Sequence, residues 1–468
     1  MKLTYDVADK PKGAQLLILA LQQMLAILAA TIAVPMIVRN GLTPAAAMFG
    51  AGVGTIVYQL FTRRKSPVFL GSSFAFLGSM ASAFAGGVSM QLGMLGLILG
   101  AVLAGMVYVV IAAVIRIVGV EWLNRLMPPA VIGPTVAIIG LSLAGNAVGD
   151  LQKGDVVTDA GLTASPYAAI ICGLVTLATV MVCSTYGKKT ARLIPFILGI
   201  LAGYACAAVL TVIGSLADIT AIKLVDFSVF KSYMMPDDSL TFRAFLSLPE
   251  FTFKEAFRGT GEFTGSYFMT IFAAYVPVAF VVFAEHVADH KNLSSIIGRD
   301  LLKEPGLTNT LLGDGVGSMA GAFFGGCPNT TYGESIACVA ITGNASSVTI
   351  LTAAFGCILF SFITPLIAFV DSIPSCVMGG VCIALYGFIA VSGLKMLQKV
   401  DLGNNRNLFT ASVILISGIG GLSLSFGKVT ITEIATALIL GILTNLLLSK
   451  APDDAPAAQS ESAQKKKH

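Results

Sequence analysis

Charged residues are scarce in this 468-residue chain: they make up 12% of it, about half the share usual in soluble proteins. Histidine occurs three times and none of the eight cysteines shows C-x-x-C spacing, so a zinc or iron–sulfur site has almost no ligands. We therefore expect no metal and no cofactor, and free thiols that pack as small apolar groups. The shortage of charge excludes a cytosolic enzyme, a nucleic-acid-binding protein and a secreted disulfide scaffold.

Apolar residues are abundant instead, at 56% of the chain with a mean hydropathy of +0.85. A membrane span needs roughly 20 such residues, and about 14 spans would use near 60% of the length. The pattern predicts an all-α polytopic membrane protein with spans at residues 14–38, 45–62, 67–86, 90–115, 128–147, 166–184, 191–214, 266–288, 309–325, 328–344, 347–370, 374–394, 407–425 and 430–449.

The basic residues fall unevenly around these spans. With an even number of spans both termini share one side, and 21 of the 29 lysines and arginines lie on that side. The positive-inside rule makes that side the cytoplasm. We expect a multi-pass protein of the inner (plasma) membrane with both termini cytoplasmic, and a C-terminal tail that is disordered because it has no apolar period.

Two spans are short, rich in glycine and interrupted by polar residues, at residues 67–76 and 325–334. Each is the third span of its half if the chain is two repeats of seven spans, and an odd number of spans makes the two repeats inverted. Paired broken segments at matching positions indicate a transporter binding site. No obvious sequence repeat accompanies this pattern, so position and composition carry the prediction.

Ionisable residues inside apolar spans are costly and therefore candidates for function. Glu285 and Asp289 stand at i and i+4, so they share one face of a helix. Asp289 has the alternative of lying at the cytoplasmic interface beside Lys291. Asp314 is either a structural acid bonded to a neighbouring helix or a group in ion coupling.

Glu334 follows Thr331 with the spacing of a capping box. A helix that starts in mid-membrane would direct its free N–H groups and positive dipole end into a cavity. Ser72 and Ser73 would cap the matching half-helix, where Phe74 offers a face for stacking. We also expect Gln22 or Gln23 in the first span to face the site, because amides need partners in lipid.

Together, these segments resemble the nucleobase–ascorbate transporter family, most closely its bacterial uracil permeases. The similarity covers nearly the whole chain. The matching runs are residues 21–23, 71–76, 284–287, 300–306, 328–334 and 377–380.

The resemblance implies a two-body architecture with an elevator-type mechanism, often in a homodimer. A core domain would comprise residues 14–117 and 266–370, and a gate domain residues 118–215 and 371–449. Short strands and half-helices would form spans 3 and 10. The remaining parts would be a cytoplasmic N-terminus at 1–13, an extracellular loop at 216–265 and the cytoplasmic tail at 450–468.

The resemblance also implies roles for particular residues in the import of a nucleobase, most closely uracil, with protons. The predicted substrate-binding residues are Glu285, Glu334, Phe74, Gly333, Ser73 and Tyr332. The predicted proton-coupling residues are Glu285, Asp289, Asp314 and Gln23.

Several positions depart from the family pattern. Ser335 replaces an asparagine of the signature and Ala337 a glycine, while Gln23 and Asp289 stand where other members have histidine. A purine permease of the same fold (for xanthine, urate or guanine) and an anion transporter of the related sulfate/bicarbonate class therefore remain alternatives. An intramembrane aspartyl protease does not, because Leu311 occupies the place of its required glycine.

Overall fold

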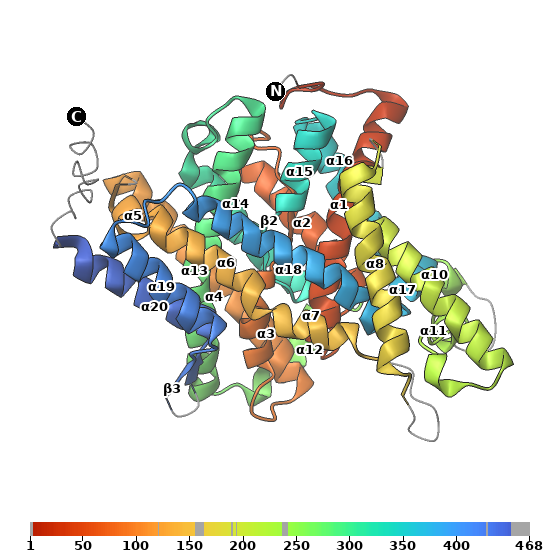
Figure 1. Ribbon diagram of the computed structural model, residues 1–468. Helices are drawn as coiled ribbons and strands as arrows, with labels where there is room; N and C mark the ends of the chain where they lie inside the picture. The colour runs from red at the N-terminus through yellow and green to blue at the C-terminus, as the bar shows by residue number, and fades with distance from the viewer. Residues whose placement is uncertain are drawn as a thin grey trace, which may run out of the picture.

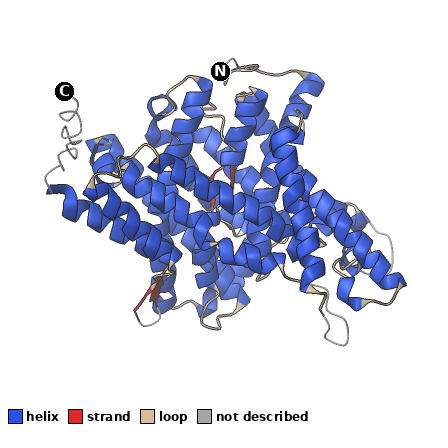
Figure 2. Cartoon of the chain, in the orientation of Figure 1, coloured by secondary structure: helices blue, strands red, loops and turns tan. Residues whose placement is uncertain are grey.

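The computed structural model describes residues 3–119, 121–154, 163–188, 191–192, 194–235, 242–426 and 429–450. It is a bundle of helices with two small pairs of strands, one near the middle of the molecule and one at its edge (Figure 2). Among the described residues, eight helices are long and apolar enough to cross a membrane. The predicted mostly helical membrane protein is confirmed at this level. The tail beyond residue 450 lies outside the described residues.

The first half of the chain begins with two long helices and a short strand–helix unit. Its elements up to residue 118 are α1 (Gly13–Val38), α2 (Pro44–Phe61), β1 (Leu70–Ser72), η1 (Phe74–Phe76), α3 (Leu77–Ala83) and α4 (Met90–Val118). Those that follow are α5 (Glu121–Leu126), α6 (Pro129–Ser142), α7 (Ala144–Leu151), α8 (Pro166–Tyr186) and α10 (Pro195–Leu216).

The second half repeats the long helix, the strand and the short helix. Its elements up to residue 371 are α13 (Gly265–Ile297), η5 (Leu302–Gly306), α14 (Leu307–Gly325), β2 (Asn329–Thr331), α15 (Gly333–Thr342), α16 (Ser347–Phe360) and α17 (Thr364–Asp371). The rest are α18 (Ser375–Leu397), α19 (Asn405–Ile419), β3 (Leu424–Phe426), β4 (Val429–Ile431), α20 (Glu433–Leu447) and η6 (Leu448–Lys450).

Several helix boundaries differ from the sequence prediction. The helix expected to end at residue 288 continues to Ile297. The segment expected as one span at 347–370 is divided between α16 and α17, where the chain turns at residues 361–363 before Thr364 and Pro365.

The stretch between α10 and α13, expected as a plain loop, contains short helices: η2 (Thr220–Ile222), α11 (Ser228–Met234), η3 (Phe242–Ala244), α12 (Thr252–Arg258) and η4 (Gly259–Glu262). Phenylalanines anchor α12 to the bundle. The ring of Phe253 stacks on Phe323 at 4.9 Å, and Phe251 meets Phe49 edge-on at 4.8 Å. Burial of these rings stabilises an ordered connection.

The helices pack in two groups. In the first group α14 packs against α2 and α4, and α13 packs against α4. In the second, α18 packs against α6 and α8, α10 against α8, and α19 against α6 and α20 (Figure 1). The two groups meet where α13 touches β4, α6 and α20 and where α1 touches α10 and α18.

Glycines bring α2 and α14 into unusually close contact. A methyl group at Gly50 would lie 2.4 Å from the carbonyl oxygen of Gly321, and one at Gly54 would lie 2.7 Å from that of Gly317. Small residues four positions apart on both helices allow such an approach in membranes. Asn329 at the start of β2 fills the gap and donates from Nδ2 to the Gly50 carbonyl at 3.1 Å.

The N-terminal segment is tied to the end of the half-helix α15. Thr4 N–H donates to Gly343 O at 2.8 Å, and Ala345 N–H donates to Tyr5 O at 2.9 Å. Nearby, Lys65 Nζ lies 2.6 Å from Glu304 Oε1 and lowers the pKa of that exposed carboxyl group. These contacts join the chain's start to the connections at the same end of the bundle.

Candidate functional site

The two strands β1 and β2 cross antiparallel in the middle of the first helix group. Leu70 pairs with Thr331 and Ser72 with Asn329. Each strand is followed by a short helix, η1–α3 after β1 and α15 after β2. The predicted strands and half-helices in both interrupted spans are confirmed.

A cavity of about 400 Å³ opens beside the ends of these strands, between the two helix groups. One wall carries most of the polar groups and comes from η1, α13, β2 and α15. The opposite wall, from α6, α10 and α18, is mainly apolar. The lining residues that matter for the chemistry are Phe74, Glu285, Asp289, Asn292, Thr331, Tyr332, Gly333 and Glu334 on the first wall, and Val136, Ile139, Phe196, Phe388 and Ile389 on the second.

The polar wall of α13 follows helical spacing. Glu285, Ala288, Asp289 and Asn292 all line the cavity, at i, i+3, i+4 and i+7. The predicted common face of Glu285 and Asp289 is therefore confirmed, and because α13 runs on to Ile297, Asp289 lies within the helix. The same helical period places Asn292 on this face, although Asn292 is not among the predicted site residues.

The start of α15 forms the other polar part of the cavity. Gly333 is its first residue and Glu334 its second, and both line the cavity. A methyl group at Gly333 would meet nothing within 4 Å, so there is open space over the backbone here. The first N–H groups of a helix have no partner inside it, so they can donate to a ligand in this space.

The predicted caps of the two half-helices are wrong. The residue preceding α15 is Tyr332, which makes no side-chain cap, and Thr331 donates its hydroxyl hydrogen to Asp289 Oδ2 at 2.6 Å instead. Ser73 precedes η1 and makes no side-chain cap either. In both places the extended strand leads straight into the helix, so the hydroxyl groups do not reach its free N–H groups.

Tyr332 is fixed by the first strand. Its hydroxyl donates to Ser72 O at 2.8 Å, and its ring covers Gly71 so closely that a methyl group there would lie 2.3 Å from Cε2. The ring therefore borders the cavity while its hydroxyl is used within the fold. Glycine at position 71 is required by this packing.

Three predicted site residues do not line the cavity. Ser73 is buried, and its hydroxyl has no hydrogen-bond partner among the described residues. Asp314 is buried against His286, with 2.6 Å between Oδ2 and Nδ1. This contact is the bond to a neighbouring helix that the structural alternative requires.

The third of these residues is Gln23, which does not line the cavity, and neither does Gln22. Gln23 Nε2 donates to Ser335 Oγ at 2.5 Å, and Ser335 Oγ also accepts from Phe69 N–H at 3.3 Å. Gln23 and Ser335, which both depart from the family pattern, therefore contact each other, next to Glu334 in the chain.

The cavity has an excess of acidic groups. Glu285, Asp289 and Glu334 line it, and among the described lining residues the only cation is Arg192, whose Nε donates to Ser184 O at 3.1 Å. A polar, acid-lined wall facing an apolar wall suits a small planar molecule that offers hydrogen-bond donors.

Comparison with known proteins agrees with a membrane permease. A model described as "Permease family" matches residues 14–426. The uracil permease of Bacillus caldolyticus is 38% identical over 458 residues, which cover 97% of this chain and 96% of that protein. The uracil permease of Escherichia coli K12 is 32% identical over 443 residues, covering 94% and 93%.

Solved structures with the same fold include the transmembrane domain of the cyanobacterial bicarbonate transporter BicA, with a TM-score of 0.59 at 14% identity, covering 92% of this chain and 96% of that one. The murine Solute Carrier 26 family member A9 anion transporter gives 0.61 at 10% identity, covering 93% and 68%.

The fold and the family match define the class: the protein is an integral-membrane transporter and not an enzyme. The chain belongs to the nucleobase–ascorbate transporter family.

Proposed function

We propose that this protein imports uracil by symport with protons. The observation that carries the proposal is the cavity in which Glu285 on α13 and Glu334 at the start of α15 line one wall beside the open backbone at Gly333. The relatives of matching length named uracil permeases support the choice of substrate.

The chemistry of the cavity suits a neutral pyrimidine. Uracil has N–H donors and carbonyl acceptors on its edge. The carboxylates of Glu285 and Glu334 accept from the N–H groups, and the N–H groups at the start of α15 and near Phe74 donate to the carbonyl oxygens. A base with another donor pattern leaves buried groups unpaired and is rejected. Ser73 and Tyr332 hold the strand ends that present these groups.

Protons couple through the acids of the cavity. Glu285 is the leading carrier, and Asp289, one turn further along α13, is the second. Gln23 and Asp314 act indirectly, because neither lines the cavity. Gln23 contributes through Ser335, which adjoins Glu334.

The movement we propose is a slide of one helix group past the other. The core comprises residues 14–117 and 266–370 and the gate residues 118–215 and 371–449, arranged as two inverted repeats of seven spans. The division of the cavity into a polar and an apolar wall supports this, since an apolar wall offers a moving ligand few polar contacts to break. In this proposal the protein lies in the plasma membrane with both termini in the cytoplasm, and two copies form a homodimer.

Uptake of labelled uracil by cells lacking their own uracil permease tests the assignment. We expect saturable uptake that Glu285→Gln and Glu334→Gln each abolish or weaken, because a charge-assisted hydrogen bond contributes about 1.5–3 kcal/mol, or roughly ten- to a hundredfold in affinity. Unchanged uptake in both variants would remove the site.

Competition with unlabelled bases separates the alternatives. Unlabelled uracil should displace the label, whereas xanthine, urate and guanine should not. Displacement by a purine would identify a purine permease of the same fold. An anion site is disfavoured, because carboxylates beside the start of α15 would repel an anion.

A further inference from the structure

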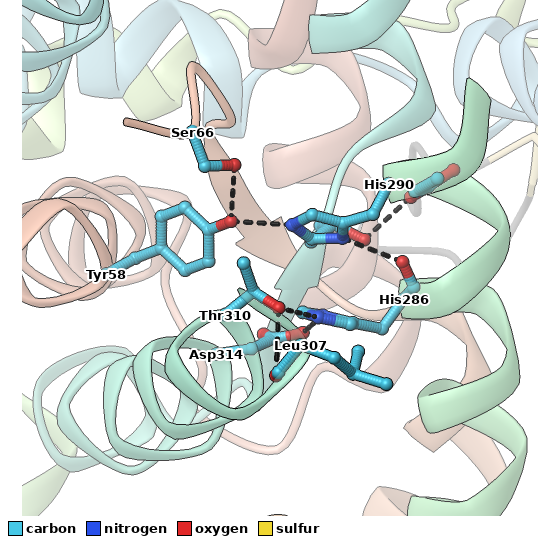
Figure 3. A network of polar contacts seen from close by, with 9 residues as sticks. Tyr58, Ser66, His286, His290, Leu307, Thr310 and Asp314 are labelled. Atoms are coloured by element: carbon cyan, nitrogen blue, oxygen red, sulfur yellow. Dashed lines mark hydrogen bonds and ion pairs between the residues drawn. The ribbon is translucent and has the colours of Figure 1, made fainter. Parts of the chain in front are cut away.

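A buried chain of polar side chains connects α13 to α14 and α2 (Figure 3). His286 and His290 alternate along α13 with Glu285 and Asp289, and neither histidine lines the cavity. His286 Nδ1 lies 2.6 Å from Asp314 Oδ2, and its Nε2 lies 3.0 Å from Thr310 Oγ1. The side chains of all three residues are inaccessible to solvent.

The hydrogen atoms around His286 follow from donors and acceptors alone. Thr310 donates its single hydroxyl hydrogen to Leu307 O at 3.0 Å, because a carbonyl oxygen only accepts. His286 Nε2 must therefore supply the hydrogen in its contact with Thr310. The contact between His286 Nδ1 and Asp314 Oδ2 then needs one further proton, on the ring or on the carboxyl group. In both cases the pair has no net charge.

The surroundings of Asp314 favour a pair without net charge. Its second oxygen, Oδ1, has no hydrogen-bond partner among the described residues. A full negative charge on a buried group with a bare oxygen is strongly disfavoured. The titratable groups that face the pair offer no cation, being Tyr58 on α2, Tyr108 on α4, and His290, Glu285 and Asp289 on α13.

The second branch of the chain has its hydrogens assigned in the same way. His290 Nδ1 donates to the carbonyl oxygen of His286 at 2.8 Å, so the neutral ring accepts at Nε2 from the hydroxyl of Tyr58 at 2.7 Å. Ser66 then donates to Tyr58 Oη at 2.7 Å. None of the residues in this branch lines the cavity. The branch therefore offers no route for a proton from the cavity.

We propose that His286 and Asp314 keep one shared proton throughout the transport cycle and fix the rotation of α13 that turns Glu285 and Asp289 to the cavity. Asp314 is then a positioning residue, and the coupling proton is carried by the cavity acids. The positioning role rests on the proposed function; the shared proton does not, because it follows from the hydrogen-bond geometry.

Nitrogen-15 NMR of labelled histidine tests the shared proton directly. The chain has three histidines, so a His468→Gln background leaves only His286 and His290, and His290→Gln assigns the two. In liposomes, with and without uracil, we expect both rings to keep their protonation from about pH 5 to pH 9, where an ordinary histidine titrates. Gain or loss of a proton by His286 in this range, or on adding uracil, would overturn the proposal.

Asp314→Asn tests the positioning role. The asparagine Nδ2 donates to His286 Nδ1 where the shared proton was, so we expect uptake to fall several-fold but to keep the wild-type pH profile and accumulation against a gradient. Asp314→Leu leaves Nδ1 unpaired and should lower uracil binding by more than about tenfold. If Asp314→Asn binds and exchanges uracil but no longer accumulates it, Asp314 carries the coupling proton and the proposal is wrong.

The two tests separate this proposal from the proposed function. If the wild-type protein binds no uracil, the proposed function fails while the NMR measurement still decides whether the proton is shared. If Asp314→Asn does not fold, the NMR measurement on the wild-type side chains again decides.

Discussion

Thr331 has two possible uses for its hydroxyl group, and the sequence alone does not choose between them. The spacing to Glu334 predicts a capping box, but the hydroxyl donates to Asp289 on α13. The acceptor is 42 positions away along the chain, so only the packing of β2 against α13 brings it within reach. The contact links the strand that precedes α15 to an acid in the cavity wall.

Replacing Thr331 by valine should therefore impair transport. The change keeps the shape but removes the hydrogen that Asp289 accepts, at a cost of about 1–3 kcal/mol for the unpaired carboxylate. We expect uracil uptake to fall by roughly tenfold. We also expect the pH optimum of uptake to shift, because Asp289 loses a hydrogen-bond donor that favours its charged form. Initial rates of uptake across a pH series measure both effects.

Thr330→Val is the matched control. Thr330 also lines the cavity and is equally buried, but its hydroxyl has no hydrogen-bond partner among the described residues. A similar loss in both variants would show that β2 tolerates no valine and that the bond to Asp289 has no special part.

At the scale of elements, the sequence predicted much of the site. Gly71 with its serines and the run from Pro328 to Glu334 predicted broken spans, and these segments form the strands β1 and β2 with their short helices. Helical spacing also predicted the common face of Glu285 and Asp289. Both predictions depend on local pattern, which a single sequence contains.

Contacts between distant elements could not be predicted in this way. The pair of His286 and Asp314 depends on how α13 packs against α14, and the pair of Gln23 and Ser335 depends on how α1 packs against α15. Helix periodicity says which residues share a face but not which helix covers that face. The sequence therefore showed that Gln23 and Ser335 each depart from the family pattern, but it did not show that the two residues contact each other.

The close contact of α2 and α14 gives a prediction on stability. A methyl group at Gly54 would lie 2.4 Å from Asn329 Nδ2, so Gly54→Ala forces the helices or the strand apart. Overpacking of this kind costs about 1–3 kcal/mol. We expect a lower midpoint of thermal unfolding in detergent.

Gly145→Ala provides the control, since a methyl group there meets nothing within 4 Å and the residue lies in helix α7. Its midpoint should match or slightly exceed that of the wild type, because alanine favours a helix. Equal midpoints for Gly54→Ala and the wild type would contradict the tight contact.

At the scale of the whole molecule, a hydrogen bond joins the two helix groups. Arg39 Nη2, at the end of α1, donates to Ser375 Oγ, at the start of α18, at 2.9 Å. If the groups slide past each other, this distance must change during each cycle.

A chemical cross-link between these positions should stop transport. In a background without native cysteines, Arg39→Cys/Ser375→Cys joined through two mixed disulfides by a bis-methanethiosulfonate reagent of suitable length should lose uracil uptake, and should regain it when a reductant cleaves the disulfides. A pair within one group, Gln91→Cys/Glu255→Cys between α4 and α12, should keep its uptake when joined, since Gln91 Nε2 and Glu255 Oε2 are already 3.4 Å apart there. Uptake that survives the first cross-link would exclude the slide.

The unequal walls of the cavity have a consequence for how such a protein can diversify. Its acids and the open backbone belong to one assembly of helices, whereas the facing surface is mostly hydrocarbon. Substitutions on the first side would alter which cargo is accepted, and substitutions on the second would alter how quickly it travels. Selectivity and turnover can therefore evolve almost independently of each other.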